Sequence, residues 1–114
     1  MKTVTICGSM KFKNEMMKIA FMLEIDHHFN VLQCVYNTEN RSVSESEMKA
    51  LEEAHFKRIE ISDAIYVLDV NGYIGQQVTK EIEYAESLDK EIIYHSEFVR
   101  GDNIGETENG SEIL

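Results

Sequence analysis

The sequence predicts an α/β protein, a three-layer sandwich with a parallel sheet of about four or five strands and helices on both of its faces. Apolar β-type runs and helical patterns alternate along the chain from strand to helix to strand, ending on a fourth strand. This alternation is typical of parallel strands joined by helical crossovers. The run from Ala64 to Asp69 is almost continuously apolar, as expected for a central strand that is covered on both faces.

Length and charge limit the organisation and the partners. The chain has 114 residues, of which 43% are hydrophobic, which suits one domain and leaves no room for two. We expect this domain at residues 1–96, followed by an acidic, mobile tail at 97–114, part of which could add an edge element. The formal charge of −10 disfavours a nucleic-acid polymer as partner, whereas a local basic site could still hold a small phosphorylated ligand.

The composition also favours a cytoplasmic protein. No apolar run approaches the roughly 20 residues that span a membrane, and the opening MKTVTICGSM is too short and polar for a signal peptide. Cys7 and Cys34 each lie in an apolar β-type run without metal-ligand spacing. We therefore expect buried, reduced thiols rather than a disulfide, and neither a metal, a cofactor nor a membrane contact.

The individual elements follow from local patterns. Strands are expected at Lys2–Cys7, Phe29–Val35, Ala64–Asp69 and Glu91–His95. A first helix is expected at Lys13–Leu23, where Met16, Ile19, Ala20 and Leu23 share one face. A polar loop at Asn37–Glu47 precedes a second helix, capped by Ser44 or Ser46, with Met48, Leu51 and Ile59 in one stripe. In such a sheet the ligand site lies beyond the carboxyl ends of the strands.

The third helix carries one misplaced carboxylate. With Val78 at zero and about 100° per residue, Ala85 falls at about −20° and Glu81 at about −60°, inside the apolar arc. A carboxylate on the packed face must be paired, hydrogen-bonded or used in chemistry. Glu81 is therefore either an acid, base or nucleophile, or a structural group bonded to a backbone N–H or to Tyr84.

Two other places admit both a functional and a structural interpretation. The segment from Gly8 to Lys11 follows a strand and opens a helix, so it is either an anion site or a plain turn. His55 shares the apolar stripe of the second helix and is either a satisfied core residue or a ligand and proton contact. Gly72 and Gly75 supply turn conformations or allow a ligand to approach the backbone.

Three segments together resemble the nucleoside 2-deoxyribosyltransferase-like superfamily. They read ICGSMKF near the start, SDAIYVLDV in the middle and GYIGQQVTKEIEYAESLDKEIIY after it, and the similarity covers roughly Lys2 to His95. The best-marked part is the glycine-containing turn followed by E-x-x-Y-A and a K-x-I strand. The superfamily includes nucleoside deoxyribosyltransferases and deoxynucleoside 5′-monophosphate N-glycosidases.

The resemblance implies a Rossmann-like sheet and a site for a small nucleoside or nucleotide. It implies that Glu81 attacks the anomeric carbon of the sugar, and that water or a second base then resolves the glycosyl-enzyme intermediate. It places His55 beside Glu81 as an acid, base or sugar contact. It assigns substrate contacts to two segments, Gly8, Ser9, Met10, Lys11 and Phe12 in the first, and Asp69, Asn71, Gly72, Tyr73 and Gly75 in the second.

One position departs from the family pattern. The enzymes carry an aspartate on the preceding helix, eight residues before the aspartate of an A-D pair that opens the third strand. In this chain, counting back eight residues from Asp63 gives His55. A histidine can transfer protons but does not replace a carboxylate. The alternatives to an enzyme are therefore a non-catalytic nucleotide-binding or sensing module, or an interaction protein with a vestigial pocket. We expect a homodimer or larger homo-oligomer, because helix faces remain that could pair.

Overall fold

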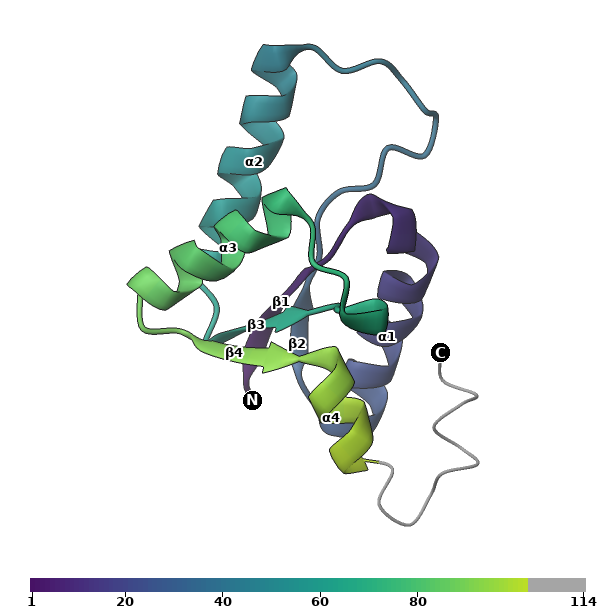
Figure 1. Cartoon of the computed structure of the whole chain (residues 1–114), viewed down its shortest axis with the longest axis vertical. Coiled ribbons are helices and arrows are strands. Elements are labelled where there is room, and N and C mark those ends of the chain that lie inside the picture. Colours follow the sequence, from purple (N-terminus) through teal and green to yellow (C-terminus); the bar gives the residue numbers. More distant parts are fainter. Residues whose placement is uncertain (103–114) are drawn as a thin grey trace.

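Four parallel strands form one sheet in the computed structural model, which describes residues 1–102 (Figure 1). They are β1 (Thr3–Cys7), β2 (Asn30–Leu32), β3 (Ala64–Val67) and β4 (Glu91–Tyr94), in the spatial order β2-β1-β3-β4. In the register of the sheet, Val4 of β1 lies between Val31 of β2 and Ala64 of β3. The direction of winding reverses between β1 and β3, and ligands of such sheets bind beyond the strand ends at this switch point.

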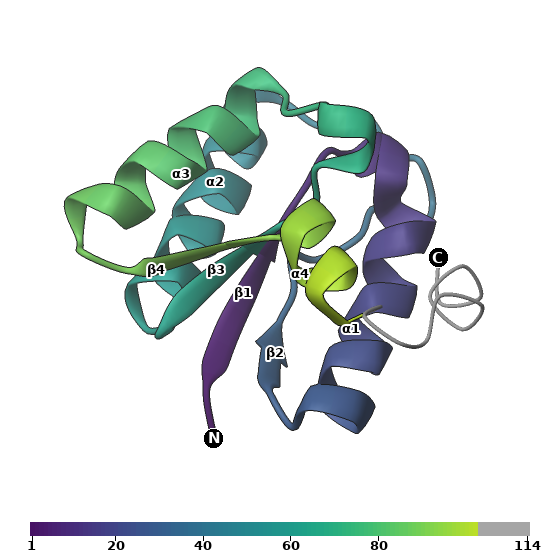
Figure 2. The ribbon, with the colours of Figure 1, turned by 60° about the horizontal axis from the view of Figure 1, so that its bottom comes forward.

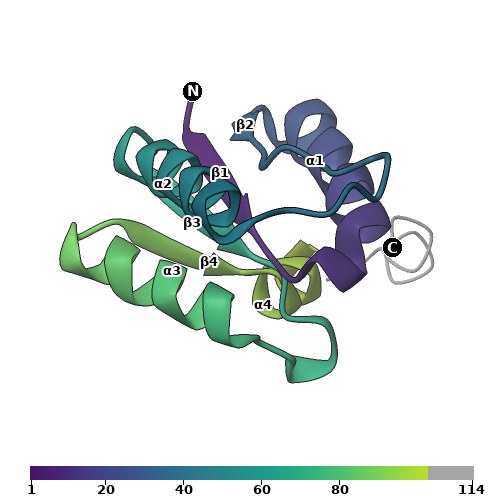
Figure 3. The ribbon, with the colours of Figure 1, turned by 90° about the horizontal axis from the view of Figure 1, so that it is seen from above.

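Helices cover both faces of the sheet, which confirms the predicted three-layer α/β sandwich. They are α1 (Lys13–His27), α2 (Glu45–Glu60), α3 (Gln76–Ser87) and α4 (His95–Asp102), with short 3-10 helices η1 (Met10–Phe12) and η2 (Val70–Gly72). Helices α1 and α4 lie on one face, and α2 and α3 lie on the other (Figures 2 and 3).

Side-chain alternation along the strands divides the core into two parts. Val4 and Ile6 of β1 pack toward α1, whereas Cys7 packs on the other face with Ile59 of α2 and Val78 of α3. All four residues of β3 are fully buried, as expected for a central strand. Within residues 1–102, no helix has the length and apolar character needed to cross a membrane.

The structure confirms the start of α2 and shortens the loop before it. Ser44 caps the helix in a capping box. Its hydroxyl accepts from the backbone N–H of Glu47, and the Glu47 carboxylate accepts from the backbone N–H of Ser44. The helix therefore begins at Glu45 rather than after Glu47. On the opposite side, β2 is only three residues long, and Cys34 beyond it is half-buried rather than buried.

Helix α4 continues to Asp102, past residue 96 where the sequence predicts the domain to end. The strand before it ends at Tyr94 instead of His95. Asp69, at the end of β3, accepts hydrogen bonds from the backbone N–H and the hydroxyl of Ser96 at 2.9 and 2.7 Å. This carboxylate caps α4 from a distant part of the chain. The rest of the expected tail, 103–114, lies outside the described residues.

His95 joins the first turn of α4 to the core. The residue is 4% exposed, and its ring Nδ1 is hydrogen-bonded to the hydroxyl of Tyr66. Its Nε2 has no hydrogen-bond partner among residues 1–102. Burial lowers the pKa of His95, against an opposing effect of the Asp69 carboxylate. The folded protein therefore holds this imidazole neutral.

We expect acid to weaken the fold through His95. Its folded pKa lies below its unfolded value of about 6.5, so below that pH the unfolded chain binds a proton that the folded protein refuses. This contribution to the free energy of unfolding is absent above about pH 6.5 and becomes a loss as the pH falls. Urea unfolding at several pH values should show a steeper loss for the wild type than for His95→Gln. Equal pH dependence in the two proteins would contradict the assignment.

Candidate functional site

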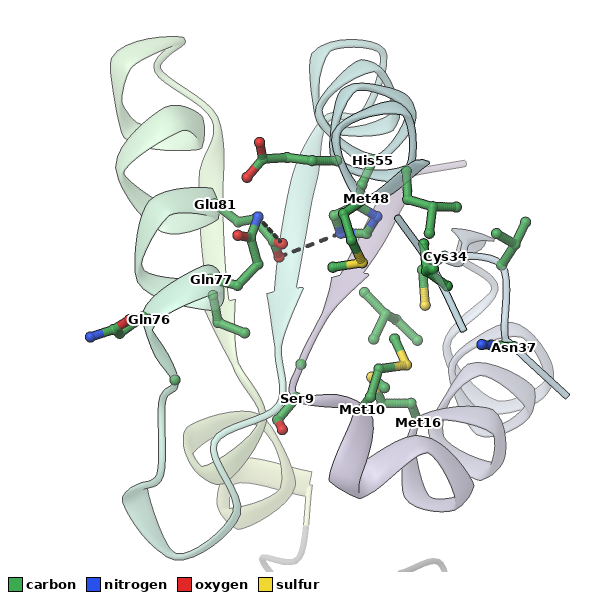
Figure 4. Close-up of a pocket in the computed structure, with 18 of the residues that line it drawn as sticks. Ser9, Met10, Met16, Cys34, Asn37, Met48, His55, Gln76, Gln77 and Glu81 are labelled. Atoms are coloured by element: carbon green, nitrogen blue, oxygen red, sulfur yellow. Dashed lines mark hydrogen bonds and ion pairs between the residues drawn. The ribbon is translucent and has the colours of Figure 1, made fainter. Parts of the chain in front are cut away.

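A pocket of about 810 Å³ opens beyond the carboxyl ends of β1, β2 and β3, on the side of the sheet covered by α2 and α3 (Figure 4). Its walls come from the segments after β1, β2 and β3, the length of α2 and the first two turns of α3. Pockets that bind drug-sized ligands and cofactors commonly enclose roughly 300–1,000 Å³. The pocket therefore has room for a nucleoside-sized ligand, and it lies where the sheet topology predicts one.

Glu81 and His55 meet at the floor of this pocket. Glu81 is 6% exposed and His55 is 8% exposed, and Nε2 of His55 lies 3.5 Å from Oε1 of Glu81. The second carboxylate oxygen, Oε2, accepts a hydrogen bond from Nε2 of Gln77 at 3.2 Å. The side chains come from different helices and point toward each other in Figure 4. Two polar residues that looked misplaced in separate apolar stripes thus form one contact.

Arg58 contacts the second ring nitrogen of His55. Its Nη1 lies 3.5 Å from Nδ1 of His55, one turn along α2. A guanidinium can only donate, so Nδ1 accepts and the proton of a neutral ring is on Nε2. That proton lies within reach of Glu81, so His55 can hold the carboxylate in place.

Cys7 lies directly beneath this pair. Its Sγ is 3.6 Å from Nε2 of His55, and its side chain is 1% exposed. Burial, and next the negative charge of Glu81, hold the pKa of Cys7 well above its usual value. The thiol is therefore protonated at neutral pH and packs as part of the core.

The first predicted loop is only partly in the pocket. Gly8, Ser9 and Met10 line it, whereas Lys11 and Phe12 do not. Within the loop, the Ser9 hydroxyl accepts from the backbone N–H of Lys11, and the Ser9 carbonyl accepts from that of Phe12. Two donors that an anion would use are thus already occupied.

Gly8 allows β1 to approach α1 closely. A Cβ atom built at this position would lie 2.9 Å from Sδ of Met16 and 3.1 Å from Cβ of Leu68. Those separations are below van der Waals contact, so the glycine permits close packing beneath the pocket.

The second predicted segment, from Asp69 to Gly75, also lies only partly in the pocket. Tyr73 and Gly75 line the pocket, while Asp69, Asn71 and Gly72 do not. Asp69 caps α4, and Asn71 and Gly72 have positive φ angles of 52° and 78° that shape the turn. The structure therefore gives Asp69 a structural contact in place of the expected position in the pocket.

Tyr73 joins the two loops. Nζ of Lys11 lies 3.5 Å from the centroid of the Tyr73 ring, and the ring of Phe12 packs edge-on against it at 6.0 Å. Cation–π and edge-to-face contacts of this kind stabilise two rings and a cation without burying the charge. Lys11 is thus directed toward Tyr73 rather than into the pocket.

The sequence missed most of the α2 wall. Met48 and Leu51 had the spacing of core residues, but they are 57% and 42% exposed and line the pocket. Lys49 and Arg58 are the basic residues among the lining residues that the structure describes. The sequence did contain a sign of this wall, because the polar residue His55 lies in the same apolar stripe as Met48 and Leu51. Hydrophobic periodicity alone, however, cannot distinguish a pocket wall from a core face.

Comparisons of the chain with protein-family models, with curated proteins and with solved structures give no match. The interpretation of the pocket therefore depends on its own residues.

Proposed function

We propose that the protein cleaves or transfers at the N-glycosidic bond of a small nucleoside or nucleotide, with Glu81 as the nucleophile. The observation that carries this proposal is a buried carboxylate at the floor of a nucleoside-sized pocket, with a separate contact to each of its oxygens. Such contacts fix the direction of attack. The resemblance of the sequence to the deoxyribosyltransferase-like superfamily supports the same assignment.

The chemistry follows the logic of retaining glycosidases. A carboxylate oxygen of Glu81 forms a bond to the anomeric carbon as the bond from that carbon to the base nitrogen breaks, and the leaving base takes up a proton from water. Water or a second base then displaces Glu81 from the sugar. His55 positions the nucleophile, because its Nε2 faces Glu81 and its Nδ1 faces Arg58.

The basic side chains of the pocket suggest where a phosphate would bind. Lys49 and Arg58 line the wall formed by α2, and the first turn of α3 lies opposite, where Gly75 provides no side-chain cap. Cations and free helix N–H groups both attract an anion. A 5′-phosphate would therefore contact α2 and α3 rather than Lys11.

A non-catalytic nucleotide-binding module is the second candidate. The observation that favours it is His55 itself, because a histidine held between Arg58 and Glu81 lacks the carboxylate that the related enzymes place there.

One screen distinguishes the two functions. The purified protein is incubated with ribo- and deoxyribonucleosides and with their 5′-monophosphates, and free base is measured by chromatography. Thermal unfolding is followed in parallel, since a ligand that binds the folded state raises its melting temperature. We expect base release from at least one deoxy compound. A thermal shift without release identifies the binding module, and the absence of both overturns the two proposals together.

A further inference from the structure

Three chemically different metal-binding atoms meet beneath the pocket. They are Sγ of Cys7 at the end of β1, Nε2 of His55 on α2 and a carboxylate oxygen of Glu81 on α3. All three residues are buried, and the three atoms lie within 4.8 Å of one another. The three residues are distant in the sequence, with Cys7 and His55 separated by 48 positions, so no local motif indicates the cluster.

Two of the three separations match those around a single tetrahedral ion, and all three are within 4.8 Å. With Zn–S near 2.3 Å and Zn–N near 2.0–2.1 Å, neighbouring donors of such a site lie roughly 3.3–3.6 Å apart. In the structure, Nε2 of His55 lies 3.6 Å from Sγ of Cys7 and 3.5 Å from Oε1 of Glu81. His55 is thus the central donor of the three, within coordination range of both Cys7 and Glu81.

We propose that Cys7, His55 and Glu81 bind a zinc ion, Zn²⁺, at the floor of the pocket. A thiolate and a carboxylate together balance the two positive charges, and the neutral imidazole supplies the third donor. The fourth position faces the pocket, because His55 and Glu81 line it while Cys7 lies beneath them. The thiol releases its proton to solvent as the sulfur–metal bond forms, and no electron transfer is involved.

Arg58 opposes this ion. When Nε2 binds the metal, the remaining ring proton is on Nδ1, which can no longer accept from the Arg58 guanidinium. The positive charge of Arg58 also repels the cation. Its side chain is only partly buried and must turn away from the ring. Replacing Arg58 with glutamine should therefore tighten metal binding, which no purely structural role of the three donors would predict.

The ion and a sugar would compete for Glu81. A carboxylate oxygen that binds zinc cannot attack an anomeric carbon, so zinc should inhibit base release. This inhibition rests on the proposed function, whereas metal binding itself does not.

Titration with Co²⁺ tests the site on the full chain without any substrate. We expect a cobalt–thiolate charge-transfer band in the near ultraviolet, and Zn²⁺ should abolish it by displacement. Cys7→Ser should remove the band, and Glu81→Gln and His55→Gln should each weaken binding by at least about 10-fold. Circular dichroism verifies that each variant is folded, and Glu81→Gln keeps the test valid if Cys7→Ser does not fold.

Cys34→Ser is the matched control, because Cys34 is the other thiol near the pocket and is only half-buried. It should keep the band, and Arg58→Gln should bind Co²⁺ more tightly. A band that survives in Cys7→Ser, disappears in Cys34→Ser, or never forms in the wild type overturns the proposal. Co²⁺ binding without base release leaves the metal site standing and removes the glycosidase function. Base release that saturating Zn²⁺ does not affect overturns binding at Glu81.

Discussion

Glu81→Gln is expected to abolish base release while the protein remains folded. The amide has the size of the carboxylate but is a poor nucleophile, so no glycosyl-enzyme intermediate forms. We expect a fall in kcat of at least about 1,000-fold, equivalent to about 4 kcal/mol of transition-state stabilisation. Stability should change little, because an amide can still meet Gln77 and His55.

Glu83→Gln provides the control for this result. Glu83 lies on the same helix as Glu81 and is exposed to solvent, and its replacement by glutamine removes the same charge. Its base release should equal that of the wild type, measured with the best compound from the screen. Intact-mass spectrometry of acid-quenched wild type should also show one added deoxyribosyl group, and Glu81→Gln should show none. A Glu81→Gln protein that retains full activity would exclude Glu81 as the nucleophile.

Asp69→Ala is expected to produce a large loss of stability. Asp69 is 8% exposed, and both of its carboxylate oxygens accept hydrogen bonds from Ser96 at the start of α4. Removing a helix cap costs about 1–2 kcal/mol, and leaving a partly buried donor unsatisfied adds to this. We expect urea denaturation to show a free energy of unfolding lower by roughly 2–3 kcal/mol.

Two other substitutions set the scale for Asp69. Asp69→Asn keeps one acceptor and should lose less stability than Asp69→Ala. Asp26→Ala removes an exposed aspartate from α1 and should be close to neutral. If Asp69→Ala weakened ligand binding but left stability unchanged, the structural role would be contradicted and Asp69 would instead be a ligand-binding residue.

The layers of the fold were predictable because each depends on local patterns. Both the alternation of strands and helices and the unbroken apolar run of β3 can be recognised in one sequence. Helix α4 was missed because its signal is not local: it is short, and its cap comes from Asp69, 27 residues earlier in the chain. No helix-start pattern near His95 records that contact.

For the candidate site, too, the sequence revealed individual residues but not the contacts that the topology creates between them. Glu81 and His55 were both detectable, since each is a titratable group inside an apolar stripe. Their contact with Cys7 was not, because a buried cysteine in a strand is ordinary and the three residues meet only through the topology. The exposure of Met48 and Leu51 was not detectable either, because a shared apolar stripe does not reveal how far α2 extends past the sheet.

The contact of Lys11 and Phe12 with Tyr73 has a consequence for how molecules enter the pocket. It fastens the loop after β1 to the loop after β3, so that this side of the mouth behaves as one fixed edge. The facing edge is the segment at 33–44, which contains neither helix nor strand and crosses from β2 to α2 (Figure 3). The segment at 33–44 is therefore the edge that controls access to the pocket. Changing its length or the size of its side chains should change which ligands can enter.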